Sequence, residues 1–108
     1  MLNQAAAAIL VCGDLDRAFP PAPDFWVIDA AIAAQNMTLA ANDLGIGSVW
    51  LGTWPDEKRV KRQAAIFQLP ETIVPHSILA LGYPAEDIDM RAVRPSRYEE
   101  NRVHVNQW

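Results

Sequence analysis

Three apolar segments alternate with two helix-like segments along the chain, and a polar tail follows them. Residues 5–13 form a continuous apolar run that includes Ile9 and Val11 and ends at a glycine followed by an aspartate. A run of this kind is typical of a strand buried on both faces. Residues 47–51 and 76–82 are two further strand candidates, because each is a short apolar run bounded by glycine.

The longest helical pattern covers residues 24–44. Asp24 is a suitable N-cap, and Gly45 stands where a helix end favours a left-handed residue. The polar side chains of this segment fall into two narrow stripes, and nearly all others are apolar, so we expect a helix buried on two sides. The stripes are Asp29, Asn36 and Asp43, and Gln35, Thr38 and Asn42. A 108-residue chain has little material to cover both sides, which predicts that a partner chain covers one of them.

A second helix is expected after residues 52–57, which carry a capping residue, a proline and two acids in the order that a helix start prefers. It should end near Phe67. Residues 20–23 and 69–75 contain several prolines and are interpreted as loops, and residues 85–108 have no clear periodicity. The order strand, helix, strand, helix, strand predicts a layered α/β or α+β sheet in a single domain, residues 1–108.

Composition narrows the class of protein. Half of the residues are apolar and a fifth are charged, as in globular proteins. The single cysteine, Cys12, excludes an internal disulfide and favours a reducing, cytoplasmic location. The first residues lack the basic start of a signal peptide, and no apolar run approaches the ~20 residues that span a bilayer. We therefore expect neither export nor a membrane segment.

Charge is distributed unevenly. Eleven of the 13 acidic residues precede position 91, whereas four of the nine basic residues follow position 90. An acidic body argues against nucleic acid as a partner, since that binding requires many contacts from Lys and Arg to phosphates. The basic tail remains suited to a single small anion.

Several candidate chemical sites fail on spacing or order. Gly45 and Gly47 resemble part of a dinucleotide-binding motif, but they follow a helix and precede a strand, which reverses the required order. His76 and His104 have no second metal ligand at helical spacing, so we expect no metal site. No nucleophile-elbow motif surrounds any serine, and a hydrolase triad is not favoured.

Two features could bind a ligand, and each also has a structural explanation. Leu51, Gly52 and Thr53 lie where a strand ends and a helix begins, so their backbone N–H groups could meet an electron-rich ligand or could belong to a simple cap. Arg94 and Arg97 could grip a phosphate with two guanidinium groups, or could lie on a solvated tail.

Taken together, several motifs resemble the nitroreductase family in the right order along nearly the whole chain. The first group runs from Gln35 through Asn42 to the stretch Leu44-Gly45-Ile46-Gly47-Ser48-Val49-Trp50-Leu51-Gly52. Leu69-Pro70-Glu71, Val74-Pro75-His76 and Leu81-Gly82-Tyr83-Pro84-Ala85-Glu86 follow. The ending Arg94, Arg97, Val103, His104, Asn106 and Trp108 resembles the carboxy-terminal end of that family.

This resemblance implies an α+β, nitroreductase-like α/β sandwich represented by its carboxy-terminal part and lacking the amino-terminal portion. It implies an intertwined homodimer with FMN at the subunit interface and NAD(P)H as electron donor. The electrons would pass to a nitroaromatic, a quinone or a similar small acceptor. Leu51, Gly52 and Thr53 would present backbone groups to the N5 and O4 edge of the flavin, and Arg94 and Arg97 would lie near its phosphate.

The alternative is a non-catalytic or truncated chain that completes a flavin site only with another polypeptide. The family's Arg-rich start, and the single Pro-Ser…Asn-x-Gln-Pro stretch that follows that start, do not occur in this sequence. Met1 accordingly resembles an internal position of a longer protein. The sequence does not indicate the natural acceptor or a preference between NADH and NADPH.

Overall fold

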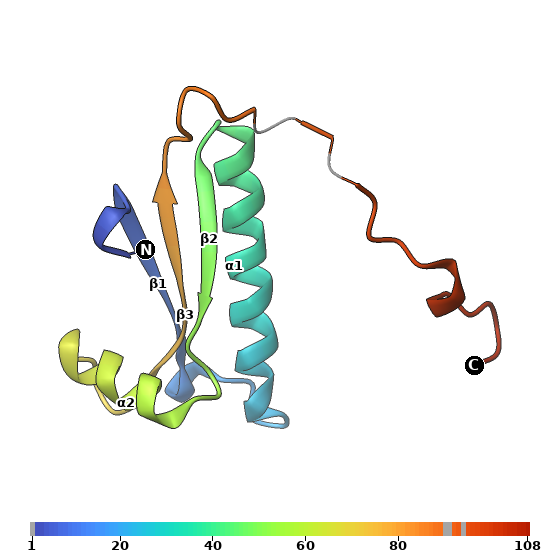
Figure 1. Cartoon of the computed structure of the whole chain (residues 1–108). Helices are drawn as coiled ribbons and strands as arrows, with labels where there is room; N and C mark the ends of the chain where they lie inside the picture. The colour runs from blue at the N-terminus through green and yellow to red at the C-terminus, as the bar shows by residue number, and fades with distance from the viewer. Residues whose placement is uncertain (1, 90–91, 94) are drawn as a thin grey trace.

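The computed structural model describes residues 2–89, 92–93 and 95–108 and has an α+β fold, as predicted (Figure 1). Its main elements are β1 (Ala7–Asp14), α1 (Trp26–Asp43), β2 (Gly47–Gly52), α2 (Glu57–Ile66) and β3 (Ile73–Gly82). Short 3-10 turns occupy Leu2–Gln4, Leu15–Arg17, Pro23–Phe25 and Glu100–Arg102. The predicted order of strands and helices is confirmed.

The three strands form an antiparallel sheet in the order β1-β3-β2, so the last strand in sequence lies at the centre. Its central position agrees with its burial, because the six consecutive residues from Pro75 to Ala80 are buried. β2 is an edge strand: it pairs with β3 along one side, from Gly47 opposite Gly82 to Gly52 opposite Ser77.

The expected loop at residues 69–75 is partly wrong, because β3 begins at Ile73 and includes Pro75. Proline has no backbone N–H to donate to a neighbouring strand. A central strand therefore tolerates it mainly at a bulge. Here Val11 pairs with Ser77 and Cys12 with Pro75, which leaves His76 as the extra residue of a β-bulge. The bulge explains how a proline enters the central strand.

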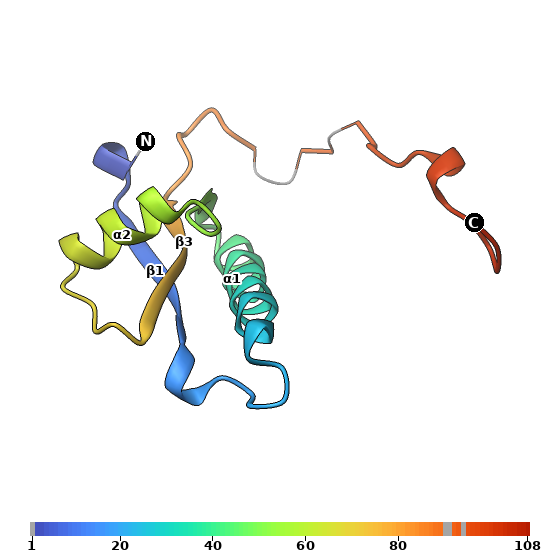
Figure 2. The same cartoon turned by 90° about the horizontal axis from the view of Figure 1, so that it is seen from below.

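α1 packs along one face of the sheet through Trp26 and a row of alanines, Ala30, Ala34 and Ala41. Figure 2 shows α1 and α2 on opposite sides of the strands. Close packing of the Trp26 ring depends on Gly13, since a Cβ atom at that position would stand 2.2 Å from the ring. Only the side of α1 that faces the sheet is buried within this chain.

The two ends of α1 differ in how well they match the sequence. Asp24 is not the N-cap: it lies in a preceding 3-10 turn, and Phe25 is the N-cap, without a side-chain cap hydrogen bond. The other end confirms the prediction, because Gly45 has a φ of +72°. The N–H groups of Gly45 and Ile46 bond to the carbonyls of Asn42 and Ala41, a Schellman ending.

After β3 the chain leaves the body as an extended arm that runs to the carboxy terminus (Figures 1 and 2). Residues 85–89, 92–93 and 95–108 of this arm are exposed, and within it the ring centroids of His104 and Trp108 lie 4.6 Å apart. In the parts of the chain that the structure describes, we find no helix with the length and apolar character needed to cross a membrane.

Candidate functional site

The turn after β2 is built on the carbonyl group of the bulged residue. The N–H groups of Thr53 and Trp54 donate to the His76 carbonyl oxygen at 3.1 and 3.0 Å. The Trp54–Pro55 peptide bond that follows is cis. The bulge in β3 therefore holds the turn that carries Leu51, Gly52 and Thr53.

The hydrogen bond from Thr53 also sets which backbone groups of β2 face outward. In an antiparallel ladder, residues that bond to the neighbouring strand alternate with residues whose N–H and C=O groups face away from it. Because Thr53 bonds to His76, the N–H and C=O of Gly52 face the free edge of β2. Consistently, the Gly52 carbonyl accepts a hydrogen bond from Arg59 Nη1 at 3.0 Å.

Among the three residues predicted for this turn, Gly52 is thus the one that offers a backbone N–H to a ligand. A Cβ atom built on Gly52 would meet nothing within 4 Å, so the space on that side of its Cα is open. An open glycine beside an outward N–H allows a flat ring to approach the chain closely. The residues at this edge therefore fit the electron-rich edge of a flavin.

Thr53 has a different role. Its side chain is 1% exposed, and its hydroxyl donates to Gln63 Oε1 at 3.0 Å. Since Gln63 belongs to α2, this bond ties the turn to the following helix. Thr53 thus fixes the turn from the inside, while its backbone N–H is used by β3.

The expectation that the helix start would offer free N–H groups needs correction. α2 begins four residues after Thr53, and its N-cap is Asp56. The Asp56 carboxylate accepts from the N–H groups of Lys58 and Arg59 at 3.0 and 3.2 Å. These donors are therefore satisfied by the cap and are not available to a ligand.

An aromatic cluster that was not predicted from the sequence lies beside the turn. The rings of Trp26 and Trp54 meet edge to face with centroids 5.2 Å apart, and His76 lies between Trp26 and Trp50 at 6.0 and 6.1 Å. A sequence signal existed, because Trp50 and Trp54 flank Gly52 at equal spacing. The cluster makes one side of the turn apolar.

His76 is a buried, neutral member of this cluster. Its side chain is 8% exposed, Nδ1 lies 3.1 Å from Ser77 Oγ, and burial lowers its pKa below 6.5. Burial raises the pKa of the Cys12 thiol, which keeps that group protonated near neutral pH. Among the described residues, no group of three or more His, Cys, Asp or Glu side chains could hold a metal ion.

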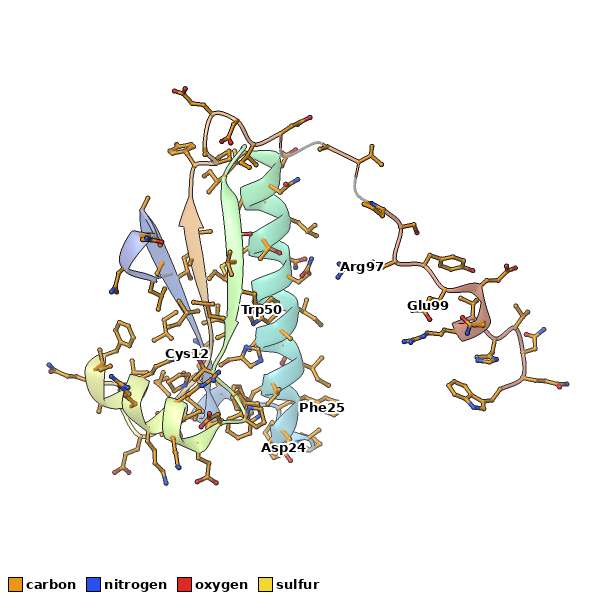
Figure 3. All side chains as sticks on the ribbon, in the orientation of Figure 1. Cys12, Asp24, Phe25, Trp50, Arg97 and Glu99 are labelled. Carbon is orange, nitrogen blue, oxygen red and sulfur yellow. The ribbon has the colours of Figure 1, made fainter. Side chains whose placement is uncertain are left out.

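The predicted phosphate ligands are not brought to this turn within one chain. Arg94 lies outside the described residues. Arg97 lies on the extended arm, and Figure 3 shows its side chain well away from Trp50 and the sheet. An ion pair in the same arm joins Arg102 and Glu99 at 2.7 Å.

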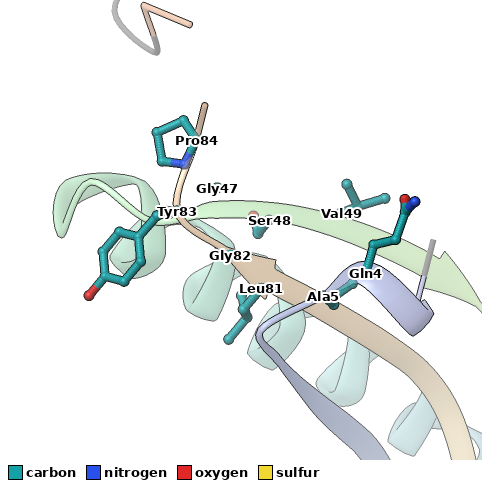
Figure 4. A pocket seen from close by; sticks show the side chains of 10 residues that line it. Gln4, Ala5, Gly47, Ser48, Val49, Leu81, Gly82, Tyr83 and Pro84 are labelled. Carbon is teal, nitrogen blue, oxygen red and sulfur yellow. The ribbon is translucent and has the colours of Figure 1, made fainter. Parts of the chain in front are cut away.

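A shallow groove of about 330 Å³ lies at the opposite end of β2 (Figure 4). It is lined by Gln4 and Ala5 from the amino-terminal segment and by residues of the sheet and of its exit, including Gly47, Val49 and Tyr83. Its walls are mostly apolar. It is separate from the Gly52 turn, and no pattern in the sequence predicts it.

Comparison with known proteins places this geometry in context. Residues 1–83 match the model of a family described as the nitroreductase family. A protein of Methanothermobacter thermautotrophicus, named as a candidate NADH dehydrogenase/NAD(P)H nitroreductase, is 41% identical over 108 residues, which cover 100% of this chain and 53% of that protein.

Two solved structures are also similar to this chain in fold and sequence. A candidate NADH oxidase from Clostridium acetobutylicum has a TM-score of 0.85 and 33% identity, with 96% of this chain and 60% of that chain covered. A nitroreductase with bound FMN from Bacteroides fragilis has a TM-score of 0.66 and 26% identity, with coverage of 98% and 54%. This chain spans about half the length of the curated relatives it matches.

Proposed function

The chain belongs to the nitroreductase family, and from that premise we propose that it forms part of an FMN-dependent oxidoreductase that takes electrons from NAD(P)H. The proposal is carried by the outward N–H of Gly52 at the free edge of β2, together with the open space where a Cβ atom of this residue would lie. The similarity to a nitroreductase with bound FMN supports it.

Bound FMN would supply the hydride chemistry, so the chain needs no acid or nucleophile of its own. Gly52 donates its N–H to the electron-rich edge of the ring. Trp50 and Trp54 form an apolar side of the turn that keeps water away from it. The acceptor is a small molecule such as a nitroaromatic or a quinone.

We further propose that the working unit is a homodimer, or this chain with a complementing nitroreductase chain. The outer side of α1 exposes Ile28, Ile32 and Leu39, at 54%, 55% and 59%. The carboxy-terminal arm extends away from its own body, and Arg97 lies well away from Trp50 of the same chain, which supports a role for Arg97 at the site of a partner. Arg94 and Arg97 then hold the FMN phosphate in the assembly.

The alternative role is non-catalytic: the chain completes a flavin site only with a second polypeptide. The apolar groove at the Gly47 end of β2 favours it, because this groove offers an apolar surface to a second polypeptide. A cytoplasmic location belongs to either role, because the single thiol of Cys12 suits a reducing compartment.

The experiment is to incubate the purified chain with FMN, separate it by gel filtration and record its visible spectrum. NADPH and NADH are then added without oxygen. Co-eluting flavin bands that bleach with either nucleotide support the oxidoreductase. Flavin that binds but is not reduced supports the non-catalytic role, and a colourless protein contradicts flavin binding by this chain alone.

A further inference from the structure

Arg59 is the charged residue that the structure holds against the proposed flavin edge. Its guanidinium donates from Nη1 to the Gly52 carbonyl at 3.0 Å and from Nε to Asp56 Oδ2 at 3.2 Å. Its backbone N–H is fixed by Asp56 Oδ1 at 3.2 Å. Two contacts thus orient the side chain, which is still 64% exposed.

This contact changes the chemical character of the edge. A free strand edge presents N–H donors and C=O acceptors in alternation. The Arg59 guanidinium donates one of its five N–H groups to the Gly52 carbonyl, so this acceptor is no longer open to a ligand. The N–H groups of the guanidinium that remain unused are added to the edge as donors. Beside the outward N–H of Gly52 the edge therefore becomes rich in donors, and it carries a positive charge.

Neighbouring charges only partly offset this one. Asp56 pairs with Arg59, and Lys61 pairs with Glu57 at 3.5 Å. Lys58 and Arg62 add two further positive charges to the same helix. Four of the five basic residues before position 91 lie in this one stretch of an otherwise acidic body.

On the basis of the flavin function proposed above, we propose that Arg59 is a positioning residue that makes the Gly52 edge bind reduced flavin in preference to oxidised flavin. Oxidised FMN takes two electrons and one proton from NAD(P)H to give an anionic reduced form and NAD(P)⁺. A donor-rich, positively charged edge stabilises the anion more than the neutral ring. Arg59 thereby raises the reduction potential of the cofactor.

The test compares Arg59→Gln, Arg59→Lys and Arg62→Gln. Arg62 lies on the same helix, and among the described residues no hydrogen bond or ion pair joins it to the turn, so its variant controls for charge on α2. FMN affinity is measured by quenching of flavin fluorescence, and the midpoint potential by equilibration with redox dyes. Thermal unfolding without FMN verifies that each variant folds.

We expect Arg59→Gln to bind oxidised FMN nearly as well as the wild type and reduced FMN about tenfold more weakly. A tenfold change corresponds to a fall of about 30 mV in the two-electron potential. Arg59→Lys should keep most of the increase in midpoint potential, because lysine keeps the positive charge. Arg62→Gln should leave the midpoint potential unchanged. High salt should shrink the difference, since the guanidinium is exposed.

Equal potentials in the wild type, Arg59→Gln and Arg62→Gln would overturn the role of Arg59 while leaving the flavin function intact. Equal shifts in the two glutamine variants would overturn it too, because they would indicate a general effect of helix charge. A wild-type chain that binds no FMN would remove the flavin function and the role of Arg59 together.

Discussion

Gly13 and Gly52 show how one residue type serves opposite purposes in this chain. A Cβ atom at Gly13 would lie 2.2 Å from the Trp26 ring, whereas one at Gly52 would meet nothing within 4 Å. We expect Gly13→Ala to lower the free energy of unfolding by about 1–3 kcal/mol through overpacking. Denaturant unfolding measures the change, and unchanged stability would contradict the packing of Trp26 against Gly13.

Gly52→Ala is the matched control, and it also tests the site. Its stability should stay within about 0.5 kcal/mol of the wild type, as for most exposed substitutions. FMN affinity should fall at least about tenfold, because the added methyl occupies the space next to the outward N–H. If Gly52→Ala binds FMN as well as the wild type, the flavin does not lie against this glycine.

His76 predicts how stability depends on pH. Burial lowers its pKa below the 6.5 of an exposed histidine, so the unfolded chain binds a proton more readily than the folded one. Stability should therefore fall as the pH drops from about 6.5 through the lowered value of the folded state, and it should be insensitive to His76 above that range.

The variant His76→Asn can keep a hydrogen bond to Ser77 but does not titrate. Its overall stability should be lower, since the ring contacts with Trp26 and Trp50 are lost. Its slope of unfolding free energy against pH should be flatter than that of the wild type between pH 7 and 5.5. Parallel slopes would mean that His76 gains its proton without cost to the fold.

At the scale of elements, the apolar runs and the glycine ending of α1 were sufficient to predict the order of strands and helices. Two local features could not be predicted from the pattern of apolar and polar residues alone. Asp24 looked like an N-cap but lies in a 3-10 turn, because capping depends on backbone geometry as well as residue type. Pro75 looked like a loop residue, and the bulge at His76 admits it to the central strand.

The two aspartates allow a direct test of which one caps a helix. Asp56→Ala removes the acceptor for the N–H groups of Lys58 and Arg59 and should cost roughly 0.5–2 kcal/mol of stability. Asp24→Ala removes no cap bond of α1 and should cost less than about 0.5 kcal/mol. Denaturant unfolding of both variants checks this, and equal losses would be inconsistent with the observed caps.

At the scale of the whole molecule, the family resemblance and the α+β class were accessible from the sequence, and the comparisons confirm both. The proposed site was only partly accessible. Gly52 could be singled out because it lies at a strand end, but the Arg59 contact and the aromatic cluster depend on how α2 and the bulge turn the chain. Arg97 was predicted to lie near the flavin phosphate, but within one chain its side chain lies well away from Trp50 and the sheet.

The exposed side of α1 provides the last prediction. Ile28, Ile32 and Leu39 lie on one stripe of the helix and are each more than half exposed, so a partner that covers them would bury apolar area at the centre of an interface. We expect the wild-type chain of 12.0 kDa to sediment at about twice that mass. Ile32→Asp should shift it towards the monomer, because a buried carboxylate is strongly disfavoured.

Phe67→Asp is the control, because Phe67 is exposed to a similar degree, 50%, but lies at the end of α2 on the other side of the sheet. Sedimentation equilibrium over a range of concentrations should give at least a tenfold weaker dimer for Ile32→Asp and no change for Phe67→Asp. If the flavin site requires both subunits, co-eluting FMN should be lost in parallel with the dimer. A monomeric wild type that still retains FMN would contradict a shared site and would assign flavin binding to the single chain.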